Sequence, residues 1–267
     1  MPSMTRRCTG WAARSSATAA LLIGGAALAD PLDTLVSSYP EKIARRDGGA
    51  IVFRDGTRLN AGTSDPQKPF DLLLRDASVL DQLRLAYPRR AEIAAPSKDF
   101  DPGRFRNETF FNALYGDCRK GEVSKHLVPV VWLPKHWGRT VMVARANGVA
   151  EHLRAVSAEL DTSPDNVVRA AYPTAGIYSC RPVKDTGRLS MHSYGAAIDL
   201  NLKFSNYWLW EAKDGNIPYR NAMPRQIVDI FERHGFIWGG RWRHYDTMHF
   251  EYRPELLRCA THEEAVR

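Results

Sequence analysis

Two histidine-centred clusters in the C-terminal third of the chain constrain its fold more than any other feature. In the first cluster, His192 precedes a glycine turn, and Asp199 follows at the end of a short strand of small and apolar residues. In the second cluster, His249 opens another apolar strand, three residues after Asp246. Both clusters therefore place a histidine and an aspartate beside short strands.

The residue types in these clusters match a metal site. Two histidines and one aspartate form a three-ligand zinc set that leaves a fourth position open for water, as catalytic zinc sites do. His192, Asp199 and His249 fit the ligand positions, and Asp246 could accept the proton from that water. Spacing alone leaves an alternative open, in which the histidines lie in the core or on the surface and the aspartates are caps.

The N-terminus has the features of a secretory signal peptide. Three arginines precede the apolar run Ala17–Leu28, and a small-x-small cleavage pattern ends at Ala29. This run is much shorter than the roughly 20 residues that span a bilayer, so we expect residues 1–29 to be cleaved. The sequence thus predicts a protein exported to the periplasm or cell envelope, with no stable membrane anchor after cleavage.

Composition narrows the class of partner. The chain is 44% hydrophobic and 25% charged, which excludes a disordered or collagen-like protein. Cleavage would remove three arginines and no acid, which lowers the net charge from +7 to +4. A mildly basic exported protein suits an anionic surface such as a cell wall. The sequence has no concentrated stripe of Lys and Arg, so we expect no nucleic-acid partner. We also expect the protein to be a monomer.

Hydrophobic periodicity and turn signals divide the chain into short elements without a regular βαβ rhythm, which predicts an α+β fold: a small antiparallel sheet flanked by helices. We expect an N-terminal extension of unknown role (30–110), a main domain (111–260) and a tail (261–267), with a polar joint at 97–106. The predicted elements are a hairpin around Asp55-Gly56, strands at 128–133, 140–143, 236–238 and 249–252, helices at 148–160 and 224–234, and an extended piece at 167–180.

The two clusters also resemble known signatures. Ser190, His192, Gly195, Ala197 and Asp199 fit the pattern S-x-H-x-x-G-x-A-x-D. This pattern belongs to the zinc D-alanyl-D-alanine carboxypeptidase family, which includes L-alanyl-D-glutamate endopeptidases and is related to hedgehog signalling domains. The string from Gly235 to Phe250 resembles the family's second signature, G-F-x-W-G-G-x-W followed by D-x-x-H-F. The resemblance covers about residues 147–252, and residues 30–146 match no family that we can name.

The resemblance implies a role for each matching residue. It makes His192, Asp199 and His249 the zinc ligands and Asp246 the general base. Arg181 matches the arginine that polarises the scissile carbonyl. Ser190 matches a residue of the substrate cleft, and Trp238 and Trp242 could line the same groove or belong to the core. The implied function is a zinc metallopeptidase that cuts peptidoglycan stem peptides; the alternative is an inactive, zinc-stabilised module that binds them.

Two residues and an aromatic insert lie near the clusters but do not belong to the signatures. We expect His244 to be a solvated loop residue. From strand alternation we expect Glu251 to face away from the neighbours of His249, on the other side of the sheet. The aromatic insert of Tyr207, Trp208 and Trp210 could form a cleft rim or an interaction patch, and we favour packing in the core.

The cysteines of the expected mature chain are Cys118, Cys180 and Cys259. An odd number in an oxidising compartment predicts one disulfide and one free thiol. All three pairings are possible from the sequence, and we favour Cys118–Cys259 as a staple between extension and core.

Overall fold

A computed structural model describes residues 30–184 and 186–258, so the predicted signal peptide and Cys259 lie outside the described residues. The helices and strands that define the architecture are α1 (Pro31–Ser38), β1 (Ile43–Asp47), β2 (Ala50–Phe53), β3 (Arg58–Asn60), α2 (Phe70–Arg75), α3 (Glu108–Tyr115), β4 (Leu127–Trp132), β5 (Arg139–Ala144), α4 (Val149–Leu160), α5 (Asp165–Val168), β6 (Ala197–Asp199), α6 (Trp208–Glu211), α7 (Arg225–Arg233), β7 (Phe236–Trp238) and β8 (His249–Tyr252).

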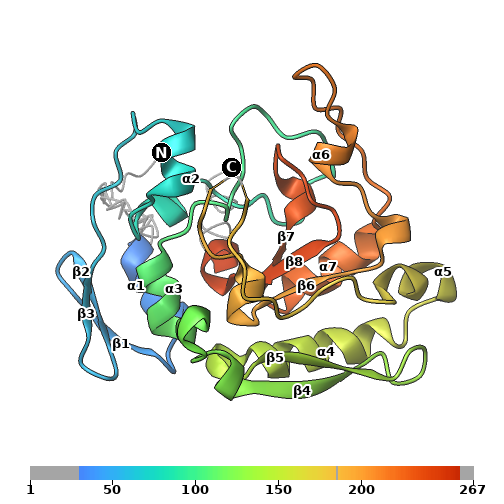
Figure 1. The fold of residues 1–267 in the computed structure, drawn as a ribbon, viewed down its shortest axis with the longest axis horizontal. Helices are drawn as coiled ribbons and strands as arrows, with labels where there is room; N and C mark the ends of the chain where they lie inside the picture. The colour runs from blue at the N-terminus through green and yellow to red at the C-terminus, as the bar shows by residue number, and fades with distance from the viewer. Residues whose placement is uncertain (1–29, 185, 259–267) are drawn as a thin grey trace, which may run out of the picture.

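The N-terminal part forms a helix and a three-stranded antiparallel sheet at one side of the molecule (Figure 1). Helix α1 begins at Pro31 because the Asp30 carboxylate accepts the backbone N–H of Leu32 at 2.9 Å, and proline favours the first helical turn. Strands β2 and β3 pair across the Asp55-Gly56 turn, which confirms the predicted hairpin.

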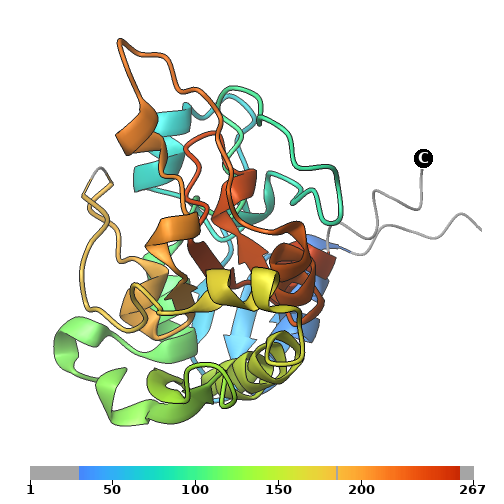
Figure 2. The ribbon, with the colours of Figure 1, turned by 90° about the vertical axis from the view of Figure 1, so that its right-hand side faces the viewer.

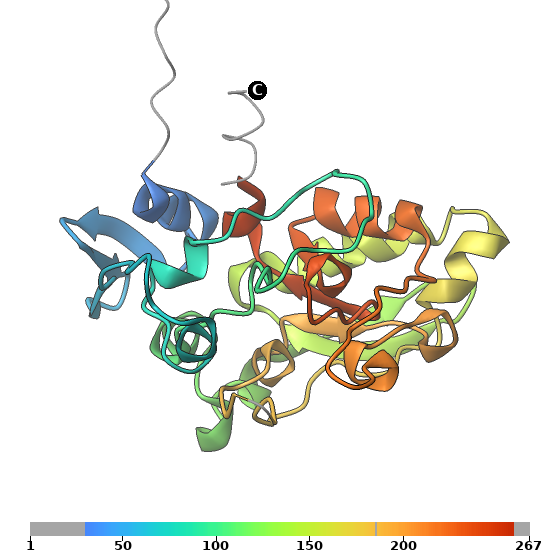
Figure 3. The same ribbon diagram turned by 90° about the horizontal axis from the view of Figure 1, so that it is seen from above.

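This N-terminal part shares its hydrophobic core with the rest of the chain. The ring centroid of Phe110 in α3 lies 5.9 Å from that of Tyr39 and 6.4 Å from that of Phe53. Leu32 of α1 and Phe250 of β8 belong to the same continuous buried cluster. Burial of apolar surface therefore links the extension to the main domain, although the chain between them passes through a long loop (Figure 3).

A β-hairpin and a helix form the layer below the central sheet in Figure 1. Strands β4 and β5 pair in antiparallel register from Leu127↔Ala144 to Trp132↔Arg139, as the sequence predicted. Helix α4 packs on this hairpin through one buried apolar face that includes Val149, Leu153 and Val156. The predicted helix at 148–160 is thus confirmed.

The prediction of an extended segment from residue 167 was wrong at its start. Val167 and Val168 end the short helix α5, and a 3₁₀ turn follows at Arg169–Ala171. The carbonyl group of Pro164 accepts the backbone N–H groups of both valines, at 2.8 and 3.0 Å. This turn buries both valine side chains, so tertiary packing overrides their preference for strands.

The central sheet carries the two histidine clusters. It has the antiparallel order β6-β8-β7, with α7 packed against it. The rings of Phe231 in α7 and Phe250 in β8 stack with centroids 4.0 Å apart. The expected mixture of helices and small antiparallel sheets is therefore confirmed, and the closer likeness to hedgehog domains stays a prediction.

The disulfide corrects our expected cysteine pairing. Cys118 is bonded to Cys180, with Cα atoms 5.7 Å apart, rather than to Cys259. The bond fixes the segment just before Arg181 to the turn that follows α3. No rule of spacing could distinguish the three pairings, because folding alone brings these segments together.

Within the described residues, no helix is long and apolar enough to span a membrane.

Candidate metal centre and its cavity

The first cluster forms a tight turn that presents His192. The Ser190 hydroxyl accepts the backbone N–H of His192 at the start of a 3₁₀ turn, and Gly195 ends this turn with φ +64°. A Cβ atom at Gly195 would lie only 2.9 Å from the backbone nitrogen of Ala144. Glycine is therefore required both by backbone conformation and by the close approach of β5.

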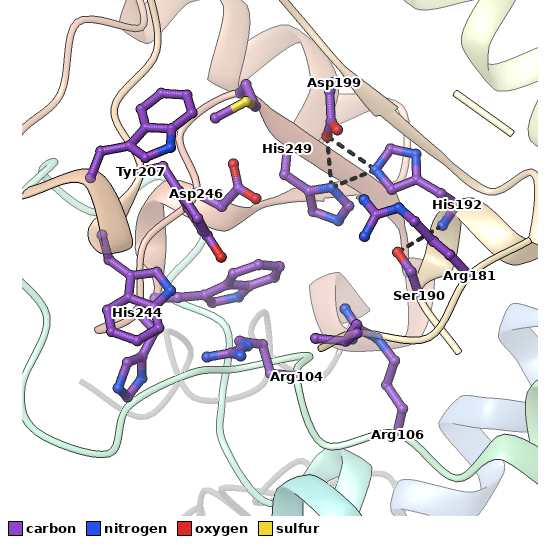
Figure 4. A pocket seen from close by; sticks show the side chains of 15 residues that line it. Arg104, Arg106, Arg181, Ser190, His192, Asp199, Tyr207, His244, Asp246 and His249 are labelled. Carbon is purple, nitrogen blue, oxygen red and sulfur yellow. Dashed lines mark hydrogen bonds and ion pairs between the residues drawn. The ribbon is translucent and has the colours of Figure 1, made fainter. Parts of the chain in front are cut away.

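The sheet register brings the other two candidate ligands together. Asp199, the last residue of β6, is paired directly with His249, the first residue of β8. Residues in direct register have neighbouring side chains on the same face of a sheet. The turn at His192 then completes a group of three ligand-type residues (Figure 4).

The three ligand atoms form a nearly equilateral triangle. The distances are 3.1 Å from His192 Nε2 to Asp199 Oδ1, 2.9 Å from His249 Nδ1 to Asp199 Oδ1, and 3.1 Å between the two histidine nitrogens. A tetrahedral zinc ion with ligand bonds of about 2.0–2.1 Å needs ligand atoms about 3.3 Å apart. The triangle is within a few tenths of an ångström of that requirement.

Hydrogen bonds at the far side of each ring orient the two imidazoles. Nδ1 of His192 can donate to the Ile177 carbonyl at 2.5 Å, and Nε2 of His249 can donate to the Glu251 carboxylate at 2.9 Å. In this arrangement the opposite nitrogens, which face Asp199, carry lone pairs. Three lone pairs that converge on one point fit a cation, and a partner on the outer nitrogen is usual for histidine ligands.

Glu251 corrects our strand-alternation prediction. Residues two apart on a strand share a face, so Glu251 lies beside His249 rather than opposite it. Its carboxylate is fully buried and forms ion pairs with Arg106 at 2.5 Å and Arg253 at 3.2 Å. Burial would raise the pKa of Glu251, but Arg106, His249 and Arg253 lower it well below its usual range, so this residue stays ionised.

The electrostatics of the triangle also favour a cation. Burial alone would lower the pKa of His249, but its interactions with Asp199 and Glu251 raise that pKa to about 10. Burial opposes ionisation of Asp199 as well, and the two histidines still hold its pKa well below the ordinary value. A positive charge is therefore stabilised between these carboxylates, and a divalent metal ion would provide one.

Asp246 has a different environment. Burial and the negative charge of Asp199 raise the pKa of Asp246 to about 7, against the opposing charges of His249, Arg104 and Arg181. Its Oδ1 atom is buried and has no hydrogen-bond partner among the described residues. A carboxyl group that titrates near neutral pH beside a metal triangle has the properties of a general base.

The triangle and Asp246 face a cavity of about 330 Å³. Arg181, Ser190 and Trp242, to which the sequence assigned roles in catalysis or substrate binding, line this cavity. Trp238 does not line this cavity. Its assignment to a substrate groove is therefore wrong, and the alternative place in the core holds. Its fully buried indole N–H donates to the Thr247 carbonyl at 2.8 Å, so Trp238 supports the loop that carries Asp246.

The cavity also includes His244 and the aromatic insert, whose roles the sequence left open or misjudged. His244 is half-buried and donates to the carboxylate of Asp101 at 2.7 Å, which corrects its interpretation as a solvated residue. The aromatic insert forms a rim rather than core, because Tyr207, Trp208 and Trp210 line the cavity and the Trp210 side chain is 60% exposed. The segment around α6 projects from the body of the molecule (Figure 2).

Two arginines from the predicted extension, Arg104 and Arg106, complete the cavity (Figure 4). They lie about 80 to 150 residues before the clusters in the sequence, and no local pattern links them to the site. The sequence feature that contains them is the polar joint at 97–106, which the sequence analysis interprets as a linker and not as part of a site.

The comparisons agree with the motifs. Residues 184–252 match a family model described as D-alanyl-D-alanine carboxypeptidase. The matched segment contains all three candidate ligands and Asp246, and begins three residues after Arg181. This match confirms the family resemblance of the two clusters. No curated protein and no solved structure matches the chain.

Proposed function

From the match of residues 184–252 to the D-alanyl-D-alanine carboxypeptidase model, together with the metal-ligand geometry, we propose that the protein is a zinc-dependent metallopeptidase that hydrolyses peptide bonds in peptidoglycan stem peptides. The observation that supports this proposal most strongly is that one cavity combines a triangle of three candidate ligands with a buried carboxyl oxygen of Asp246 that has no hydrogen-bond partner among residues 30–184 and 186–258. A purely structural zinc site would usually have a fourth protein ligand and would need no such base.

His192, Asp199 and His249 would hold the zinc ion. When bound, zinc supplies Lewis acidity toward the scissile carbonyl and lowers the pKa of water toward 7. Asp246 would accept the proton from the attacking water and transfer it to the leaving amine, a role that suits a carboxyl group with a pKa of about 7. Glu251 would keep His249 in the tautomer that presents Nδ1 to the metal.

Arg181 would stabilise the developing negative charge on the carbonyl oxygen. Its side chain lines the cavity, and its backbone is fixed on both sides. The Cys118–Cys180 bond precedes it, and its N–H donates to the Ser193 hydroxyl at 3.0 Å. A preorganised donor aimed at an oxyanion contributes about 2.7–4 kcal/mol to catalysis.

The same proposal includes a location outside the cytoplasm. A disulfide between Cys118 and Cys180 is stable in an oxidising compartment such as the periplasm or cell envelope. Peptidoglycan is also found there, and its stem peptides carry carboxylates that suit a cavity with three arginines.

Digestion of purified peptidoglycan tests the proposal. The zinc-loaded protein would be compared with its Asp246→Asn variant and with a chelated sample, and the products would be identified by mass spectrometry. We expect soluble or shortened peptides from the zinc-loaded protein alone. If the protein contains one zinc ion per chain and yields no product, the proposal is wrong and the chain is instead a binding module.

A further inference from the structure

One side of the catalytic cavity is formed by a strap, which we define as residues 100–106. The fully buried carboxylate of Asp101 fixes the strap to the second cluster, because it accepts the backbone N–H of His244 at 3.0 Å and its ring N–H at 2.7 Å. Farther along the strap, the Gly103 carbonyl accepts a hydrogen bond from Arg253 at 2.8 Å. The strap is therefore part of the site rather than a free linker.

Successive side chains of the strap point in opposite directions. Phe105 is 2% exposed and packs edge-to-face on Phe70, with ring centroids 5.5 Å apart. Its neighbours Arg104 and Arg106 both line the cavity (Figure 4). The sequence Arg-Phe-Arg therefore anchors the strap through Phe105 and presents two cations to the cavity.

The two arginines have different partners. Arg106 is committed to Glu251, the residue that orients a candidate metal ligand, through a 2.5 Å ion pair. Arg104 forms one ion pair, with Asp101 at 2.8 Å, within the part of the chain that the structure describes. A guanidinium group has five N–H donors, so Arg104 retains donors for a ligand in the cavity.

The surroundings of Arg104 hold its side chain in place. Its guanidinium carbon lies 6.0 Å from the ring centroid of Trp242, whose indole N–H donates to the Pro102 carbonyl at 2.7 Å. The Arg104 guanidinium is thus held by the Trp242 ring and by the buried Asp101 carboxylate. Because it is already ordered, it loses little conformational entropy when it binds an anion.

Arg104 and Arg181 approach the metal triangle from different segments. Figure 4 shows Arg181 with Ser190 and His192 on one side, and Arg104 nearer to Asp246 and His244. Asp246 would give its proton to the leaving amine, so groups on its side of the cavity contact the leaving part of the substrate. The geometry therefore separates an arginine for the scissile carbonyl from an arginine for the leaving residue.

We propose that Arg104 is a specificity-determining residue that binds a carboxylate of the leaving residue, so that peptides with a free C-terminal carboxylate next to the scissile bond are preferred. This inference rests on the proposed function. It assigns a role to the extension, which lies outside the matched segment. An arginine and a carboxylate can form two parallel charge-assisted hydrogen bonds, whereas a C-terminal amide lacks the charge.

Binding measurements separate this inference from catalysis. We would use the zinc-loaded Asp246→Asn protein, which should not turn over, and titrate it with N-acetyl-L-Lys-D-Ala-D-Ala as the free acid and as the C-terminal amide. We expect the acid to bind about tenfold more tightly or better, as charge-assisted hydrogen bonds do. Adding Arg104→Met should weaken binding of the acid and leave binding of the amide nearly unchanged.

Control variants keep the test interpretable. Arg58→Met removes an exposed arginine that pairs with Asp47 in the same extension, and it should retain the preference for the acid. Arg104→Lys keeps the positive charge and should retain part of the preference for the acid. This variant replaces Arg104→Met if Arg104→Met does not fold. Equal affinity of the parent for both peptides, or an unchanged preference after Arg104→Met, would overturn the inference. Failure of the proposed function would instead appear as wild-type protein that does not digest peptidoglycan.

Discussion

Removal of the Cys118–Cys180 bond should lower stability by an amount that follows from the chain topology. The bond closes a loop with a sequence separation of 62 residues. In the chain-entropy model a loop of this size restricts the unfolded chain by about 4 kcal/mol at 25 °C. For the 238 residues that would remain after cleavage of the predicted signal peptide, this corresponds to a fall in melting temperature of roughly 8–16 °C.

The assay compares the wild-type protein with a Cys118→Ala/Cys180→Ala variant by urea unfolding and thermal melting. A Cys259→Ala variant is the matched control, and it should retain wild-type stability because the bond does not include that residue. Thiol titration of the denatured, unreduced mature chain should give one thiol. Because Cys180 precedes Arg181, kcat measured well below the melting temperature should fall more than KM rises.

Two results would contradict this reasoning. A count of three thiols would show that the bond does not form in the purified protein. A loss of less than about 1 kcal/mol in the double variant, with the bond present in the wild type, would mean that the loop is already restricted in the unfolded chain.

The other predictions concern the candidate site. His192→Ala should lose zinc and activity together, and metal analysis showing one zinc per chain would remove His192 from the ligand set. Asp246→Asn should retain zinc and lose turnover, so wild-type hydrolysis by this variant would disprove its role as the base. Glu251→Gln should weaken zinc binding about 10- to 100-fold, measured by competition with a chelator, since the partner of a histidine ligand has effects of that size. Arg181→Ala should lower kcat about 10²- to 10³-fold, with little change in the melting temperature; equal effects on both would make Arg181 structural.

The group of three candidate metal ligands could be predicted because the pattern around each residue is local. His192 and Asp199 lie in one short motif, and His249 opens the strand that pairs with Asp199. Helix α4 could be predicted for the same reason, because a regular stripe of apolar residues within one segment indicates a helix. Glu251 was also within reach, because correct use of strand alternation places it beside His249.

The rest of the cavity depends on contacts that no local pattern encodes. Arg104 lines the cavity because Asp101 and His244, which are 143 residues apart, hold the strap in place. The partner of Cys118 depends on the path of the chain before the first cluster. Trp238 and Trp242 occur in the same motif, yet only Trp242 lines the cavity, because the side chain of Trp238 is fully buried in the core.

Two buried contacts, a hydrogen bond and an ion pair, join the extension to the C-terminal end of the described chain. Tyr39 bonds to Glu255 over 216 residues, and Arg106 pairs with Glu251 over 145 residues. A ribosome releases the N-terminal partners of these pairs long before the C-terminal ones. The ion pair of Arg106 with Glu251 can therefore form only after residue 251 has been synthesised, so a chain truncated before that residue would lack the contact that holds Arg106 at the cavity. Contacts of such long sequence separation form late in folding, so this side of the cavity is completed after the local elements have formed.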